Sequence, residues 1–170
     1  MKPLPIKLRP AIAGDAESIA RVHFAAVHQT AAAFYPLEVL SSWSPPADHN
    51  RVERIAQTIA AGEEVFVVCE VKGVVRGFGS IVPKSSELRA VYVDPEFTHQ
   101  RIGSAITHHL EDLAASRGVK ELTMDASVNA EEFYRKLGYT VVERGLHRLP
   151  SGLQMACAKM SKTLPPSPNQ

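Results

Sequence analysis

The sequence predicts an α/β domain in which helices pack against a mixed β-sheet. Two valine-rich runs, "EVFVVCEV" and "VVRGFGSIV", flank Lys72-Gly73, which is the pattern of a tight antiparallel hairpin. A strand-like run at 87–93, a helix-like run at 101–117 and a strand-like run at 120–126 follow the hairpin. This order is typical of a right-handed crossover that places two parallel strands side by side.

The elements before the hairpin are a strand and two helices. A short strand is expected at 6–11, and Asp15 is placed to cap the helix that follows it. The aromatic, Pro-rich stretch at 35–46 predicts a short helix or turn and then a loop. A second amphipathic helix is expected from Asp48 to Gly62. The apolar residues at helical spacing are Ile19, Val22, Ala26 and Val27 in the first helix, and Val52, Ile55 and Ile59 in the second.

The elements after the hairpin complete the layered arrangement. The helix of the crossover carries an apolar stripe and ends at Gly118. A short helix is expected at 129–138, and two strands at 139–147 and 153–161 close the domain. The apolar stripe of the crossover helix consists of Ile102, Ile106, Leu110 and Leu113.

Size and charge narrow the functional classes. The 170 residues predict one domain over 1–163 and a disordered, Pro-rich tail at 164–170. With 19 basic and 18 acidic residues, the chain is not expected to bind nucleic acid through bulk charge. No apolar run approaches the roughly 20 residues that span a bilayer, and no His/Cys/Asp cluster has zinc spacing. Cys69 and Cys157 cannot form a disulfide framework, so we expect a cytoplasmic protein in which both are core residues.

The segment between the strand at 87–93 and the helix at 101–117 is a candidate anion site. Backbone N–H groups in the first turn of a helix lack partners within the helix, and the helix dipole adds a partial positive charge there. A phosphate group is therefore favoured at this place. The sequence has neither the Gly-Lys-Ser/Thr of a Walker loop nor a dinucleotide fingerprint. A plain connection between strand and helix is the alternative.

Two segments, "LRAVYVDPEFTHQRIGSAI" and "LTMDASVNAEEFYRKLGYTVVE", resemble the GCN5-related N-acetyltransferases, and the resemblance covers residues 65–145. The first is similar to the family's acetyl-CoA turn, "Q/R-x-x-G-x-G/A". The second is similar to its "N…FYxxxGF" pattern, matched by Asn129, Phe133, Tyr134, Gly138 and Tyr139. The resemblance implies a mostly antiparallel, twisted sheet of roughly six to seven strands, about four flanking helices and a central parallel strand pair.

The resemblance also implies which residues bind acetyl-CoA as co-substrate. Gln100, Gly103 and Ala105 match the turn motif by letter, but counting from Pro95 puts its first position at Thr98. We prefer this second register, in which Arg101 replaces a glycine and either contacts a phosphate or faces solvent. The expected acetyl-CoA ligands are Val91 and Val93 on the strand, Thr98, His99, Gln100, Arg101, Ile102, Gly103 and Ser104 in the turn, and Asn129.

Acetyl transfer to an amine needs an acid for the leaving thiolate and a base for the attacking amine. The resemblance implies Tyr134 as the acid, because it stands four residues before Gly138. It implies Glu87 as the base, while His28 and a chain of waters are alternatives. Asn129 is expected either to position the pantetheine arm or to cap a helix. The alternative is that neither residue is catalytic. Tyr134 is then a packed aromatic side chain, and Glu87 is a solvated carboxylate.

The sequence therefore predicts an acyl-CoA-dependent N-acyltransferase that moves an acetyl group from acetyl-CoA to the amine of a small molecule or peptide in a ternary complex. A non-catalytic acyl-CoA-binding sensor or regulatory module with the same fold is the main alternative, and a purely structural interaction domain is another. Phe34, Tyr35 and Trp43 are predicted to line the acceptor pocket or to plug it. Family members often dimerise through the last strands, so a homodimer is expected.

Overall fold

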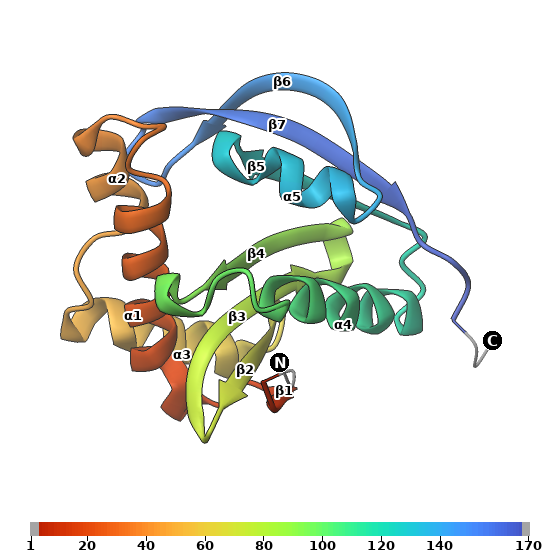
Figure 1. Cartoon of the computed structure of the whole chain (residues 1–170), viewed down its shortest axis with the longest axis horizontal. Helices are drawn as coiled ribbons and strands as arrows, with labels where there is room; N and C mark the ends of the chain where they lie inside the picture. The colour runs from red at the N-terminus through yellow and green to blue at the C-terminus, as the bar shows by residue number, and fades with distance from the viewer. Residues whose placement is uncertain (1–3, 168–170) are drawn as a thin grey trace.

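The computed structural model describes residues 4–167, and Figure 1 shows a twisted sheet flanked by helices. Seven strands lie in the order β1-β2-β3-β4-β5-β7-β6, and all neighbours except β4 and β5 run antiparallel. The predicted mixed, mostly antiparallel sheet is therefore confirmed. The strands are β1 (Ile6–Pro10), β2 (Val65–Val71), β3 (Val74–Val82), β4 (Glu87–Val93), β5 (Glu121–Ser127), β6 (Thr140–Arg148) and β7 (Gln154–Thr163).

The predicted hairpin joins β2 to β3. Lys72 and Gly73 both have positive φ, at 50° and 78°, which is the backbone of a tight two-residue turn. The ladder between β3 and β4 shifts register where Ser80 faces Ala90 and Ile81 faces Leu88, so Arg89 is an extra residue in β4. Such a bulge bends the strand and increases its local twist.

The crossover differs from the expected pair of strands running side by side. Parallel pairing of β4 with β5 is confined to one register position, at which Glu87 lies opposite Thr123. Beyond this position the two strands diverge, and Figure 1 shows β4 and β5 on opposite sides of the gap that results. Within the described chain, the edge of β4 that faces β5 has no strand partner over 88–93.

Five α-helices surround the sheet in residues 4–167, in agreement with the four or so expected. They are α1 (Ala16–Ala25), α2 (Leu37–Trp43), α3 (His49–Ala61), α4 (Ile102–Ser116) and α5 (Glu131–Lys136). A π-helical segment, η2 (Ala26–Thr30), continues α1. Asp48 caps α3 by accepting from the N–H of Arg51 at 2.8 Å, as predicted, and Gly62 and Gly118 follow their helices with left-handed φ.

Asp15 stands at the N-cap position of α1, as predicted, but its side chain does not cap the helix. Its carboxylate accepts two hydrogen bonds from Arg9 and one from the N–H of Ile12, and it makes no capping bond to α1. The carboxylate is occupied because Arg9 reaches it from β1. Asn129 does not cap a helix either, since it lies inside the 3-10 turn η5 (Val128–Ala130) that precedes α5.

The two faces of the sheet are covered differently. Helix α4 packs on one face through Ile102, Ile106 and Leu110, which are fully buried. It approaches β3 closely because Gly77 and Gly79 have no side chains beneath it. Helices α1 and α3 cover the other face of β2, β3 and β4, where Ile19, Val22, Val68, Val75 and Phe78 form a second core.

The predicted tail begins with an ordered residue. Leu164 is buried, and its N–H donates to the carbonyl of Lys120 at 2.8 Å. The prediction of disorder for 168–170 lies outside the described residues. In residues 4–167, each helix is too short or too polar to cross a membrane. The same residues bring together no group of three His, Cys, Asp or Glu side chains that could hold a metal ion.

Candidate functional site

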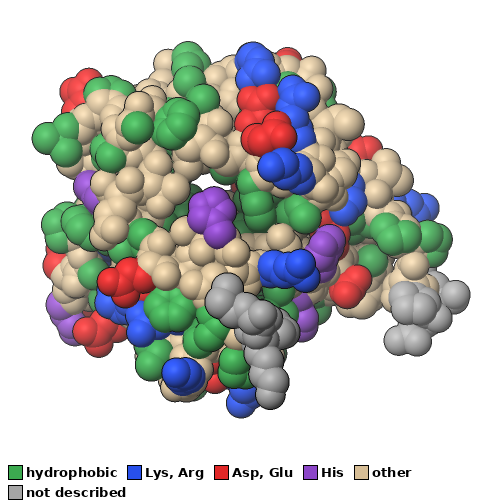
Figure 2. All heavy atoms as spheres, viewed as in Figure 1, with side chains coloured by type: hydrophobic (Ala, Val, Ile, Leu, Met, Phe, Trp, Pro, Cys, Tyr) green, Lys and Arg blue, Asp and Glu red, His purple; other side chains and the backbone are tan. Residues whose placement is uncertain are grey.

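The divergence of β4 from β5 opens two adjoining cavities. Figure 2 shows the surface hollowed between the part of the molecule that carries β5, β6 and β7 and the part that carries β1 to β4. The larger cavity measures 790 Å³ and is walled by aromatic side chains, so we call it the aromatic cavity. The other measures 610 Å³ and lies over the turn before α4, so we call it the turn cavity. The residues that line both are Trp43, Val91, Tyr92, Ser127 and Ala130.

The turn cavity collects nearly all of the predicted acetyl-CoA ligands. Its walls come from the end of β4, the segment 95–104 and the facing residues of η5 and α5. Of the predicted residues, only Gln100 lies outside its lining. The predicted residues that line it are Val91, Val93, Thr98, His99, Arg101, Ile102, Gly103, Ser104 and Asn129.

The backbone of the turn has an unusual conformation for residues with side chains. His99 and Arg101 have φ of 60° and 64°, in the left-handed region that favours glycine. Arg101 occupies the N-cap position of α4, where no side-chain cap is found in the described chain. This conformation agrees with the register in which Arg101 stands at a glycine position of the motif. The first N–H groups of α4 are therefore free to bind an anion.

A salt bridge that sequence reasoning missed holds the start of this turn in place. Asp94 Oδ2 lies 2.9 Å from Arg76 Nη1, and Asp94 Oδ1 accepts from the N–H of Glu96 at 3.2 Å. The Arg76 guanidinium also lies 4.4 Å from the ring centre of Phe97. Because Arg76 belongs to β3, these contacts fix the turn to the sheet rather than leaving it as a free loop.

The far wall of the turn cavity approaches α4 closely. Gly103 lets α4 come close to Phe133 of α5, because a Cβ atom at this position would lie only 3.1 Å from the Phe133 ring. Asn129 contributes a buried Oδ1 atom that has no hydrogen-bond partner among residues 4–167. A buried acceptor without a partner is costly, and such an atom beside a cavity fits a ligand N–H group. His99, Arg101 and Lys136 add basic side chains around the cavity.

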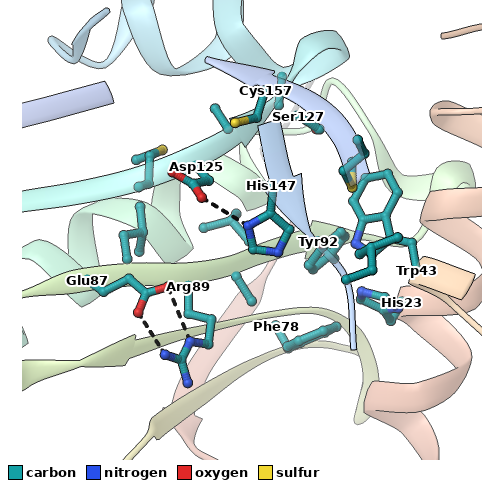
Figure 3. Close-up of a pocket in the computed structure, with 18 of the residues that line it drawn as sticks. His23, Trp43, Phe78, Glu87, Arg89, Tyr92, Asp125, Ser127, His147 and Cys157 are labelled. Atoms are coloured by element: carbon teal, nitrogen blue, oxygen red, sulfur yellow. Dashed lines mark hydrogen bonds and ion pairs between the residues drawn. The ribbon is translucent and has the colours of Figure 1, made fainter. Parts of the chain in front are cut away.

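The aromatic cavity is built around Tyr92. Its ring stacks on Phe78 with centroids 5.5 Å apart and meets the rings of His23 and Trp43 at 4.3 and 6.2 Å. Burial raises the pKa of the Tyr92 phenol to about 12. Trp43 also meets Tyr35 at 5.7 Å, and of these two Trp43 reaches the cavity. Phe34, which was expected in the same region, is 53% exposed and lines neither cavity. Figure 3 shows Tyr92, Trp43, His23 and Phe78 along one side of the cavity.

His23 is a neutral side chain in this wall. Its Nδ1 atom accepts a hydrogen bond from Arg51 Nη2 at 2.8 Å and lies 2.7 Å from Ser44 Oγ. An arginine can only donate, so the proton of the imidazole is on Nε2. Burial, and then the charge of Arg51, lowers the pKa of His23 to about 3.

The two predicted catalytic residues both line the aromatic cavity. Burial, and then Tyr92, raises the pKa of the Tyr134 hydroxyl, so it stays protonated at neutral pH. Its ring packs edge-on against Phe133 and Tyr139, with centroids 4.9 and 5.7 Å away. The carboxylate of Glu87 accepts hydrogen bonds from Arg89 at 2.7 and 3.3 Å. The sequence did not indicate this ion pair.

The alternative base, His28, lies away from both cavities. It stacks on Phe24 with centroids 4.1 Å apart, and its Nε2 contacts the carbonyl of Ser44 at 2.8 Å. Cys157 does line the aromatic cavity, although burial raises the pKa of its thiol. Cys69 is fully buried in the core, as predicted.

A pair of side chains that sequence reasoning missed projects into the aromatic cavity from β5 and β6. His147 Nδ1 lies 2.9 Å from Asp125 Oδ2 (Figure 3). The other oxygen of Asp125 lies 3.3 Å from Lys159 Nζ on β7. The pair was missed because 22 residues separate its members in the chain. Strand β7 lies between their two strands, and nothing in the local sequence of either strand indicates this order.

Comparison with known proteins gives consistent matches. The sequence model of the family described as Acetyltransferase (GNAT) domain matches residues 37–162. The chain is 27% identical over 139 residues to the uncharacterized N-acetyltransferase YafP of Escherichia coli (strain K12), covering 82% of this chain and 84% of that protein.

Solved structures are similar over nearly the whole chain. The GCN5-related N-acetyltransferase from Rhodopseudomonas palustris has a TM-score of 0.85 at 30% identity, covering 96% of this chain and 99% of that one. The PaiA N-acetyltransferase from Thermoplasma acidophilum, solved in complex with coenzyme A, has a TM-score of 0.74 at 20% identity. The similarity to PaiA covers 94% of this chain and 99% of that one.

Proposed function

Because this chain belongs to the GNAT family of acetyltransferases, we propose that it transfers an acetyl group from acetyl-CoA to the amine of a small molecule or peptide. One observation carries the proposal. The turn cavity and the aromatic cavity meet at Val91, Tyr92, Ser127 and Ala130, beside the open edge of β4. A donor in the first cavity and an acceptor in the second would therefore reach each other.

The residues of the turn cavity fit coenzyme A. The first N–H groups of α4, with Arg101 nearby, would hold the pyrophosphate, and no acidic side chain lies in the first turn of α4 to repel it. The unpaired edge of β4 at Val91 and Val93 would accept the pantetheine arm as a strand would. The orphaned Oδ1 of Asn129 would accept from an amide N–H of that arm. The complex of PaiA with coenzyme A supports this use of the fold.

Acetyl-CoA would supply the acetyl group as a thioester, and Tyr134 would supply a proton to the departing thiolate. A phenol with a raised pKa remains protonated until the thiolate forms beside it. Direct transfer to the amine fits better than a relay through Cys157. Burial keeps the thiol of Cys157 protonated, and a thiol is a far weaker nucleophile than a thiolate.

Two measurements test the proposal. Acetyl-CoA should raise the melting temperature by mass action, and a panel of amines should be screened for release of free thiol from acetyl-CoA. Tyr134→Phe keeps the ring but removes the donor, so turnover should fall by about 10² to 10⁴-fold while the melting shift persists. A melting shift without transfer to any amine would favour the acyl-CoA sensor, and the lack of any shift would refute both functions.

We further propose that the chain forms a homodimer through the free edge of β6. This strand ends the sheet in the described chain, and the side chains of Val142 and Leu146 on it are 67% and 56% exposed. An unpaired edge with apolar side chains is readily covered by a second copy. Light scattering at micromolar concentration should give a dimer mass, and Val142→Lys should give a monomer. A monomer mass for the unaltered protein would contradict the proposal.

A further inference from the structure

We propose that His147 is the general base that takes a proton from the acceptor amine, and that Asp125 positions it. The inference rests on the proposed function, because it assigns a role within that reaction. It replaces Glu87, the residue that the family resemblance implied for this task. The observation behind it is the hydrogen-bonded pair that projects into the aromatic cavity from β6 and β5.

The geometry fixes the tautomer of His147. Its Nδ1 lies 2.9 Å from Asp125 Oδ2, and a carboxylate can only accept, so the proton of the neutral imidazole is on Nδ1. Nε2 then carries the lone pair. In Figure 3 the imidazole lies between Asp125 and Tyr92, with its other nitrogen facing the cavity. A carboxylate that holds one nitrogen while the other takes a proton is the arrangement found in hydrolase triads.

Asp125 is itself held in place. Its Oδ1 lies 3.3 Å from Lys159 Nζ, so the carboxylate is oriented from β7 as well as from β6. The side chains of His147 and Asp125 are 45% and 32% exposed, so an incoming amine can reach the imidazole. The charged groups around His147 are Asp125 on β5, Lys159 on β7, Arg148 on its own strand, and Glu87 and Arg89 across the cavity on β4.

The other candidate bases are occupied. Glu87 accepts its hydrogen bonds from Arg89, so both of its carboxylate oxygens are already engaged. His23 lines the same cavity, but its Nδ1 already accepts from Arg51 and its Nε2 carries the proton. Among the histidines and carboxylates considered for this role, His147 is the one whose second ring nitrogen is left available beside the cavity.

The bonds and protons of the proposed step can all be accounted for. Nε2 of His147 takes one proton from the ammonium form of the acceptor, and the free amine then forms a bond to the acetyl carbonyl carbon. The bond between that carbon and sulfur breaks, and the thiolate takes the proton of the Tyr134 hydroxyl. The second proton that the nitrogen loses as the amide forms passes to Tyr134 after Tyr134 has protonated the thiolate. His147 then returns its proton to water, so neither residue is changed over a cycle.

The test compares His147→Gln, Asp125→Asn and Asp125→Glu with the unaltered protein on an amine that the panel identifies. His147→Gln should lower kcat/KM at neutral pH by about 10² to 10⁴-fold. The loss should shrink as pH rises, because more of the amine is then already deprotonated. Asp125→Asn should also lose activity, since it no longer accepts from Nδ1, and Asp125→Glu should restore part of it. All three variants should keep the melting shift with acetyl-CoA.

A matched control is His49→Gln, an exposed histidine on α3, which should keep the wild-type rate and pH profile. An unchanged rate and pH profile in His147→Gln would overturn the role of His147 and leave the acetyltransferase intact. An equal loss at every pH with a normal melting shift would also overturn it, because a base is needed least when the amine is already deprotonated. Failure of the unaltered protein to acetylate any amine would instead overturn the proposed function, and this inference with it.

Discussion

Arg51 donates a hydrogen bond from Nη2 to Nδ1 of His23 at a distance of 2.8 Å, in the wall of the aromatic cavity. Arg51 also donates to Ser44 Oγ at 3.1 Å and to the carbonyl of Pro45. The buried guanidinium thus ties the loop between α2 and α3 to α1. Burial, together with the charge of Arg51, keeps His23 neutral. His23 therefore has the same charge at neutral and at mildly acidic pH.

This contact predicts how stability depends on pH. The pKa of His23 is about 3 in the folded protein against 6.5 for an ordinary histidine, so below pH 6.5 the unfolded chain binds a proton that the folded chain does not. Stability from this group is therefore present above pH 6.5 and falls as pH drops, by about 2 kcal/mol between pH 6.5 and pH 5. In urea denaturation, His23→Asn should lack this part of the decline, whereas His49→Asn should retain it.

A second prediction concerns the orphaned oxygen of Asn129. Asn129→Ala removes a buried acceptor without a partner, so the free protein should melt at the same temperature or slightly higher. The affinity for acetyl-CoA should fall about fivefold, since one hydrogen bond is worth roughly 1 kcal/mol. Thermal melts with and without acetyl-CoA measure both effects. Asn50→Ala, exposed on α3, is the control, and an equal loss of affinity there would count against a direct contact.

A third prediction concerns the packing of α4 on β3. A Cβ on Gly79 would lie 2.7 Å from the carbonyl oxygen of Ala90 and from side chains of Ile106 and Leu110. Gly79→Ala should therefore destabilise the protein by about 1–3 kcal/mol, as overpacking does in tight cores. Gly14→Ala is the control, because its nearest neighbour would be 3.9 Å away. Chemical denaturation gives both values, and equal stability of the two variants would contradict the close packing.

A fourth prediction separates the effect of the charge of Arg101 from the effect of its left-handed backbone. Arg101→Gly removes the charge and relaxes the left-handed backbone, while Arg101→Ala removes the charge alone. The glycine variant should be more stable than the alanine variant by about 1 kcal/mol, the reverse of their usual order in helices. Both should lose affinity for acetyl-CoA equally, and more at low salt, if the guanidinium contacts a phosphate. Denaturation and salt-dependent binding separate the two effects.

The sequence was most informative where a signal is local. The hairpin at Lys72-Gly73, the capping of α3 by Asp48 and the order of strands and helices were all confirmed, because each depends on a few adjacent residues. Counting from Pro95 places Arg101 at a glycine position of the motif, which stays a prediction, and its φ of 64° lies in the region that favours glycine. These features can be predicted from residue types and their spacing along the chain.

The features that sequence reasoning missed depend on contacts between distant elements. Asp15 is an exception, because Arg9, which takes up its carboxylate, stands only six residues earlier in the chain. His147 meets Asp125 across β7, which lies between their strands, and chain order alone does not indicate this arrangement. The divergence of β4 and β5 likewise depends on the twist and bulge of the sheet.

That divergence has a further consequence for the sheet itself. Only at Glu87 and Thr123 are the two halves of the sheet joined across β4 and β5 in the described chain. The backbone amides along the open edge of β4 should exchange hydrogen with solvent faster than those facing β3. If a ligand lies along this edge, it completes the sheet as a missing strand would. The amides along this edge would then exchange more slowly, and amide exchange would report the binding of the ligand.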